Sequence, residues 1–172
     1  MRYLVGVATA ALLLASGSSA MAAQASATVT ANATVITPLT ASATATLEFG
    51  KLVMNTTPGG AGTLTVAPAT GNRSAAAGVD LVGGTGGQAA VVHVVGDIVN
   101  GAPNAYPVTI PATTTLSSGA NTMAVSAINT DTAGLTTLVG TVDLKIGATL
   151  TAAAGQAPGA YTGTFNVTAA YN

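Results

Sequence analysis

The 172-residue chain contains no cysteine, and only 5% of its residues are charged. The absence of cysteine excludes a disulfide framework, thiol catalysis and any cysteine-ligated metal site. The scarcity of charge, with a formal net charge of −1, argues against attraction to nucleic acid or to an anionic membrane surface. Aromatic residues make up 3% of the chain and hydrophobic residues 49%. This composition argues against intrinsic disorder and predicts a core of small aliphatic side chains.

The first 22 residues have the pattern of a secretory signal peptide. Arg2 supplies the positive charge, residues 4–15 form a short apolar run, and small residues follow at 16–23. We expect cleavage after Ala22, with Ala20 or Ala25 as alternatives. A retained membrane anchor would need a longer apolar run. The mature product is expected to pass through the periplasm to the cell surface or the medium, without an integral membrane segment.

The remaining sequence consists of short alternating runs separated by Gly, Pro, Asn and Ser. At 141–146, for example, Val142, Leu144 and Ile146 share one face of a predicted strand. Residues 89–96 are apolar on both faces, which predicts a central strand. These runs predict an all-β fold, a Greek-key β-sandwich of about eight to ten strands with no helix after the signal peptide. We expect three parts: the signal peptide at 1–22, an N-terminal arm at 23–37, and the β-sandwich domain at 38–172.

Two alternating stretches lie near the ends of the mature chain. The arm ends before Pro38, which lacks a ladder donor and marks a strand end. One face of the arm is small and apolar and comprises Ala27, Val29, Ala31, Ala33 and Val35. The final stretch begins at Gly159, and the larger apolar residues on one of its faces are Tyr161, Phe165, Val167 and Tyr171. An apolar-faced strand of this kind must be paired, covered or offered to another chain.

No motif in the sequence supports catalysis. The only histidine, His93, lies in the most apolar predicted strand, and the five acidic residues are spread singly along the chain. Asp131 is better explained by a turn than by a calcium site. An enzyme would need a polar cleft that gathers His93, Asp97 and Asp131. We therefore expect no enzymatic activity, no cofactor and no metal.

The C-terminal stretch resembles the chaperone-recognition motif of chaperone–usher pilus subunits. Gly159 is the fourteenth residue from the end, the following residues alternate, and Tyr171 is a penultimate aromatic. Leu47-Glu-Phe-Gly50 and Pro158-Gly-Ala-Tyr-Thr-Gly163 also resemble the spore coat protein U-like branch. The mature chain is closer still to a related family of cysteine-free secreted bacterial β-domains of unknown function. The resemblance implies an immunoglobulin-like sandwich that lacks its last strand, with a periplasmic chaperone and an usher as partners.

Two functional hypotheses follow from these features. In the first, the chain is a non-enzymatic fimbrial or pilus-like subunit, and the arm of one copy completes the sheet of the next beside residues 159–171. In the second, the arm pairs within its own chain. The protein would then be a self-complete secreted sandwich that serves as a surface, matrix or coat component or as a small binding module.

Overall fold

The computed structural model describes residues 24–55, 60–83, 86–99, 102–132 and 134–171. The predicted signal peptide at 1–22 lies outside these residues. The chain divides into two units, Met1–Thr34 and Val35–Asn172. In the first unit, residues 24–34 belong to no strand, and the same is true of residues 35–39 at the start of the second.

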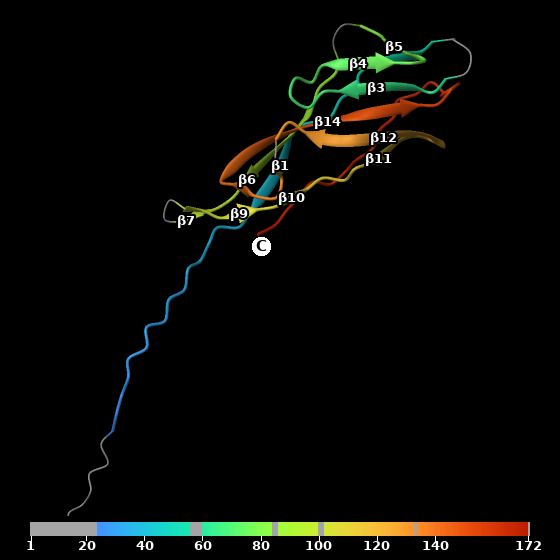
Figure 1. Ribbon diagram of the computed structural model, residues 1–172. Helices are drawn as coiled ribbons and strands as arrows, with labels where there is room; N and C mark the ends of the chain where they lie inside the picture. Colours follow the sequence, from blue (N-terminus) through green and yellow to red (C-terminus); the bar gives the residue numbers. More distant parts are fainter. Residues whose placement is uncertain (1–23, 56–59, 84–85, 100–101, 133, 172) are drawn as a thin grey trace, which may run out of the picture. The chain divides into compact units, whose positions relative to one another are not determined.

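The described residues of the second unit form β-strands and no helix (Figure 1). None of them therefore makes a helix that could span a bilayer. The strands are β1 (Thr40–Ala45), β2 (Leu52–Met54), β3 (Gly62–Val66), β4 (Arg73–Ala76), β5 (Val79–Leu81), β6 (Ala90–Val95), β7 (Ile98–Val99), β8 (Ala102–Pro103), β9 (Ala105–Tyr106), β10 (Val108–Thr109), β11 (Thr114–Ser118), β12 (Asn121–Thr130), β13 (Leu138–Val139), β14 (Thr141–Ala152) and β15 (Thr168–Ala169).

The main sheet has the strand order β1-β6-β14-β12-β11, and it continues from β14 to β3 and from β3 to β4. Short two-stranded ribbons join β10 to β15, β9 to β13, β2 to β5, and β7 to β8. All of these pairs are antiparallel. The prediction of an all-β fold is confirmed in the described residues. They form one curled antiparallel sheet with ribbons, and the finer prediction of an immunoglobulin-like Greek-key sandwich stays a prediction.

Strand β14 organises the main sheet. Along one edge its first half pairs with β6 and its second half with β3, while its other edge pairs with β12. Gly147 lies at the change of partner, where an added Cβ would approach the Val66 carbonyl oxygen to 2.2 Å and the Pro68 nitrogen to 2.6 Å. Only a residue without a side chain fits there. Opposite this point β12 shifts register between Ser126 and Asn129, and Ala127 has a positive φ of 48°. A bulge of this kind bends a strand and increases its twist, which accounts for the curl.

The core lies along the inner faces of β3, β6, β12 and β14. Leucine, valine, isoleucine and alanine dominate it, and the largest fully buried side chains are Tyr106, Leu64, Leu144, Ile146, Val66, Val94 and Val125. Val142, Leu144 and Ile146 share one face as predicted, with Leu144 and Ile146 fully buried and Val142 half-buried. Residues 90–95 form the internal strand β6, as predicted from their apolar character.

One arginine holds the loops at the β2–β5 end of the domain. The Arg73 guanidinium donates hydrogen bonds to the carbonyl oxygens of Phe49 (3.2 Å), Lys51 (3.1 Å) and Gly83 (2.7 Å). These carbonyls belong to loops on both sides of the β2–β5 ribbon. A single cation thus satisfies several loop carbonyls, which suits a chain with so few charged residues.

Replacing Leu144 by alanine tests the central position of β14. Leu144 is fully buried, so we expect the Leu144→Ala change to lower the free energy of unfolding by about 2–5 kcal/mol through lost apolar contact and a cavity. The matched control is Lys145→Ala, since Lys145 is the next residue on the strand and is exposed. Urea unfolding should show a change within about 0.5 kcal/mol for the control. Equal effects of the two changes would contradict the assignment of faces.

Candidate functional site

The C-terminal stretch runs along the outer side of β11 and then of β10 (Figure 1). Thr162 exchanges two backbone hydrogen bonds with Ser117, of 2.8 and 3.0 Å. The hydroxyl of Thr114 donates to the Thr164 carbonyl oxygen at 2.9 Å. Further on, β15 pairs with β10, and the Ala170 N–H donates to the Pro107 carbonyl oxygen at 3.3 Å. Only the two residues of β15 form a regular strand here, although the alternation extends over the whole stretch.

The two faces of this stretch differ in burial. The side chains of Tyr161, Phe165, Val167, Ala169 and Tyr171 are half-buried and pack against the core. The intervening residues Thr162, Thr164, Asn166, Thr168 and Ala170 are exposed. Gly159 and Gly163 lie so close to β11 that a Cβ would meet Ser118 Oγ at 2.6 Å and the Thr115 carbonyl oxygen at 2.4 Å respectively. These glycines therefore allow the stretch to lie against β11.

The backbone of the stretch leaves one of its edges open. Residues 162, 164, 168 and 170 direct their backbone groups toward β11 and β10. In an extended chain the alternate residues direct their N–H and C=O groups the opposite way. Within the part of the chain that the structure describes, the backbones of Gly163, Phe165 and Val167 form no hydrogen bond. We call residues 161–167 on this side the open edge.

A second free edge belongs to β1. This strand pairs with β6 on one side only and ends the main sheet. Its residues approach those of β15, so the two ends of the β-structure come side by side there. The free edge of β1 therefore lies close to β15, near the end of the C-terminal stretch.

Asp97 connects the end of the arm to the end of the C-terminal stretch. It is the one charged residue buried among those described, with 6% of its surface exposed. Its carboxylate accepts hydrogen bonds from the Thr37 N–H (2.9 Å), from the Thr37 hydroxyl and from the Asn104 side-chain amide (3.1 Å). Its own N–H donates to the Tyr171 hydroxyl oxygen at 2.5 Å. Thr37 and Tyr171 are thus held at the same point.

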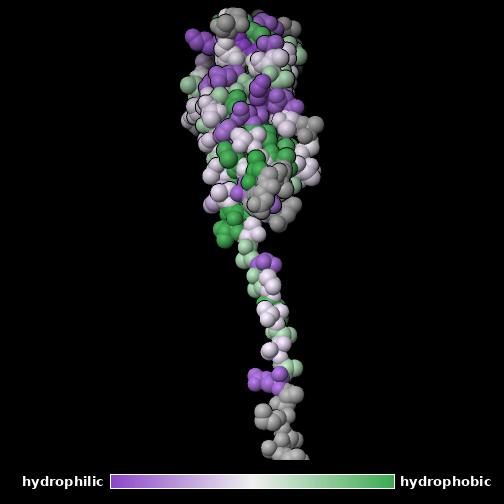
Figure 2. All heavy atoms as spheres, turned by 90° about the vertical axis from the view of Figure 1, so that its left-hand side faces the viewer, coloured by the Kyte–Doolittle hydropathy of each residue, from purple (hydrophilic) through white to green (hydrophobic). Residues whose placement is uncertain are grey.

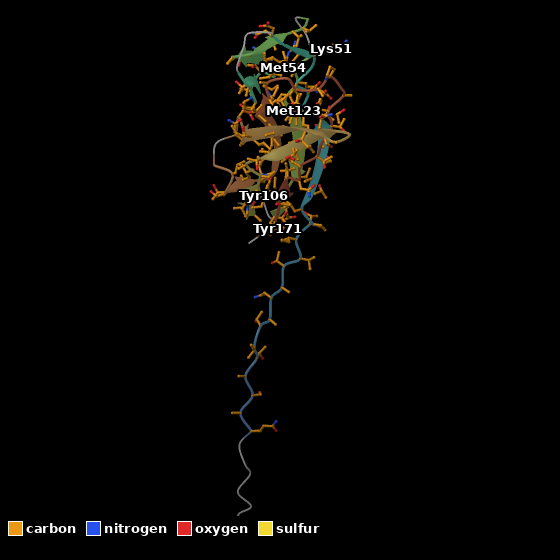
Figure 3. The ribbon with its side chains drawn as sticks, turned by 90° about the vertical axis from the view of Figure 1, so that its right-hand side faces the viewer. Lys51, Met54, Tyr106, Met123 and Tyr171 are labelled. Carbon is orange, nitrogen blue, oxygen red and sulfur yellow. The ribbon has the colours of Figure 1, made fainter. Side chains whose placement is uncertain are left out.

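Aromatic residues pack around the place where Thr37, Asp97 and Tyr171 meet. Tyr106 is fully buried, packs edge-on against Tyr171 with 6.2 Å between ring centroids, and donates its hydroxyl to the Gly140 carbonyl oxygen at 2.7 Å. Gly96 leaves room for the Tyr106 ring, since a Cβ there would lie 2.3 Å from it. Figure 3 shows Tyr106 and Tyr171 together at one end of the domain and Lys51 and Met54 at the other.

Hydrogen bonding fixes the charge of Asp97. The Thr37 hydroxyl, followed by the Thr37 N–H and then the Asn104 amide, lowers the pKa of Asp97 below its usual 3.8, against the opposing effect of desolvation. The carboxylate is therefore ionised at neutral pH. Sequence reasoning did not find this site, because Thr37 and Asp97 are 60 residues apart and no local pattern relates them.

The arm itself carries exposed valines. Val29 is 86% and Val35 94% exposed, and the remaining predicted donor residues Ala27, Ala31 and Ala33 are exposed as well. The described part of the predicted arm, residues 24–37, is in no strand. Alternation allows a segment to pair, whereas a strand forms only where another edge supplies the hydrogen bonds.

The residues that an enzyme would have to gather lie apart. His93 Nδ1 contacts Asp143 Oδ1 at 2.5 Å, in a cross-strand row with Ser42 on the exposed face of β1, β6 and β14. Asp97 is occupied by Thr37 and Asn104, and Asp131 Oδ1 accepts from the Lys145 N–H at 3.3 Å. Among the described residues, no group of three or more His, Asp or Glu side chains is placed to hold a metal.

Comparison with known proteins gives one family match. The model of a family described as "Domain of unknown function (DUF4402)" matches residues 39–171. No curated protein and no solved structure matches the chain. The matched region begins just after Thr37 and Pro38 and includes the C-terminal stretch up to Tyr171.

Replacing Asp97 by asparagine tests the connection between Thr37 and Tyr171. Because the pKa of Asp97 is lowered, the carboxylate stabilises the fold above the ordinary carboxyl pKa, and this contribution is lost as the pH falls through the lowered value. We expect Asp97→Asn to reduce the urea midpoint at about pH 7, and this deficit should shrink as the pH falls below the usual carboxyl pKa of 3.8. The control is Asp80→Asn, at an exposed carboxylate on β5. A deficit that is independent of pH would contradict this account.

Proposed function

The chain belongs to the DUF4402 family, and we propose that it is a secreted, non-enzymatic structural subunit that assembles by β-strand addition. The observation that carries this proposal is the open edge. The backbones of Gly163, Phe165 and Val167 form no hydrogen bond among the described residues, while the side chains of Phe165 and Val167 pack on the core. Such an edge is a template for an additional strand.

The same chain carries a segment suited to that edge. The arm is extended, alternates, and belongs to no strand. Added beside residues 161–167, its main chain would supply the hydrogen bonds, and its apolar face would point to the side of Phe165 and Val167. Val29 and Val35 would contribute most, since fully burying a valine gains about 1.5–3 kcal/mol.

The resemblance to pilus subunits supplies the wider setting of the proposal. In that setting the domain is an immunoglobulin-like sandwich that lacks one strand, and the arm of the neighbouring copy provides it. Secretion through the periplasm would involve a chaperone that covers the open edge and an usher that exchanges it for the arm. The finished polymer would lie on the cell surface or outside the cell.

A second candidate function rests on the free edge of β1. Only Pro38 and Leu39 separate the arm from β1, a connection short enough for a β-hairpin. The arm would then lie antiparallel beside its own β1 and complete its own domain. The protein would be a self-complete secreted component of a surface, matrix or coat, or a small binding module.

A charge in the arm tests strand addition. Val29→Asp places a carboxylate on the face that would be buried in the neighbouring copy, and burying an unpaired charge is strongly unfavourable. We expect polymers to be lost while the domain unfolds at the same urea concentration as the parent. The matched control is Thr30→Asp, because Thr30 lies on the opposite face of the arm. The proposal is wrong if the Val29→Asp protein forms polymers as the parent does.

Introduced cysteines distinguish the two candidate functions, since the parent chain has none. Proteins that combine Val29→Cys or Ala31→Cys in the arm with Val167→Cys in the open edge should form disulfides between copies if the arm adds to a neighbour. Denaturing, non-reducing gels would then show a ladder. Disulfides confined to monomers, at any protein concentration, would instead support the self-complete domain.

A further inference from the structure

The C-terminal stretch carries large and small residues in an uneven order along its core-facing side. We call this line of alternate residues the acceptor row, which comprises Tyr161, Gly163, Phe165, Val167, Ala169 and Tyr171. Its small members are Gly163 and Ala169, which are six residues apart. Gly163 has to be small, because a Cβ there would come within 2.4 Å of the Thr115 carbonyl oxygen. The acceptor row is therefore interrupted at two positions where little or no side chain extends from the backbone.

The arm carries a row of the opposite kind. Its apolar face consists of small residues except at Val29 and Val35, which are also six residues apart. We call this line the donor row, which comprises Ala27, Val29, Ala31, Ala33 and Val35. In Figure 2 the arm is coloured mostly white to green, in keeping with its alternating threonine, alanine and valine residues. The two larger residues of the donor row thus have the same spacing as the two small residues of the acceptor row.

The backbone of the open edge limits which residues of the arm can face it. Gly163, Phe165 and Val167 direct their N–H and C=O groups outward, and so does Ala169, since its two neighbours bond to β10. In an antiparallel ladder, opposite residues that exchange both hydrogen bonds have their side chains on the same face of the sheet. An arm with its apolar face on the side of the core therefore bonds through the donor row. The possible registers differ by steps of two residues.

One antiparallel register places both valines beside the small residues of the acceptor row. Its opposite residues are Val35 and Gly163, Ala33 and Phe165, Ala31 and Val167, and Val29 and Ala169. Packed interiors combine large and small residues at facing positions, because two large ones compete for the same volume. A shift of two residues in either direction places the valines beside Tyr161 and Val167, or beside Phe165 and Tyr171. The spacing therefore favours a single antiparallel register.

The polar faces of the two segments favour the same register. In it, each pair of exposed residues consists of two identical side chains, namely Thr34 and Thr164, Asn32 and Asn166, and Thr30 and Thr168. These are pairs without backbone hydrogen bonds between them, in which the side chains lie closest. Opposite threonines stabilise antiparallel sheets, and two asparagine amides can donate to and accept from each other. A shift of two residues would place a threonine opposite Asn166.

The attachment of the arm to its domain decides the direction of the added strand. A parallel arm would also place both valines beside the small residues, when its Thr37 lies beside the neighbour's Tyr171. That place is already occupied, because the neighbour's own Thr37 is bonded to Asp97, whose N–H donates to the Tyr171 hydroxyl oxygen. An antiparallel arm brings Thr37 beside Tyr161 instead, at the other end of the stretch. Antiparallel ladders are also slightly more stable per residue.

We propose that the arm of a second copy adds antiparallel to the open edge in this register, with Val35 opposite Gly163 and Asn32 opposite Asn166. This inference rests on strand addition as the proposed function. The spacing of the small residues in the acceptor row distinguishes this arm from alternating strands whose larger side chains are spaced differently. The partner of the open edge is thus a second copy of the same chain rather than an unrelated strand.

Disulfide trapping in the full mature chain tests the register. Three proteins combine Asn166→Cys with Thr30→Cys, Asn32→Cys or Thr34→Cys, and each is oxidised under assembling conditions. We expect cross-links between copies at a yield at least about tenfold higher for Asn32→Cys than for the other two, because positions displaced by two residues lie roughly 7–8 Å from Asn166 and beyond the reach of a disulfide. All four positions are exposed, so the urea midpoints should match that of the parent.

A second set of proteins tests the direction of the arm. Thr164→Cys is combined with Thr34→Cys in one protein and with Thr30→Cys in another. In the antiparallel register Thr34 lies opposite Thr164, so the first protein should give at least about tenfold more cross-links between copies than the second. A parallel arm that keeps Asn32 beside Asn166 would reverse this preference, and that result would overturn the inference.

The remaining outcomes separate this inference from the function on which it rests. Cross-links between copies that are most abundant at Thr30 or Thr34 with Asn166→Cys, or equally abundant at all three arm positions, would overturn the register and leave strand addition intact. If no arm position forms cross-links between copies, or if all disulfides stay within monomers, both the register and strand addition are wrong.

Discussion

The whole fold depends on the passage of β14 between its partners. One strand of twelve residues bonds to β6, β3 and β12, and so it must change partners midway along one edge. That change brings the backbone of residues 66–68 against position 147, which only glycine can occupy. The strand opposite this position, β12, has a bulge at Ala127. Because the sheet curls at this point, its first strand β1 and its last extended segment end up beside each other.

Sequence alone predicted the parts of this structure that depend on periodicity. The alternation of Val142, Leu144 and Ile146 identified the centre of β14, and the doubly apolar run at 90–95 identified an internal strand. Strand β4, with the sequence Arg-Ser-Ala-Ala, was missed because it has little apolar contrast between its faces. The hydrogen bonds that join Thr37 to Asp97 were missed for another reason. They depend on which distant loops meet, and no periodic pattern contains that information.

The arm shows the limit of periodicity most clearly. Its alternation is as regular as that of β14, yet residues 24–39 lie in no strand. A period of two describes side chains, whereas strand formation also needs a neighbouring backbone with free donors and acceptors. The same reasoning applies in reverse to residues 161–167. Their side chains are already seated on the core, and what they lack is hydrogen bonding on one side. The arm has the free backbone groups that residues 161–167 lack as a partner, and those residues have the seated side chains that the arm lacks.

Strand β1 pairs with β6, which is some fifty residues away in the sequence, and this separation affects the rate of folding. The other edge of β6 pairs with β14, which is also about fifty residues away in the sequence. Sheets built from such distant pairings fold slowly, in milliseconds to seconds, because loop closure must precede the contacts that reward it. During that interval β1 and the C-terminal stretch are both present without their final neighbours, and so is the arm. Protection of the newly made chain would thus matter most before the domain is finished, when its own edges are the nearest competitors for one another.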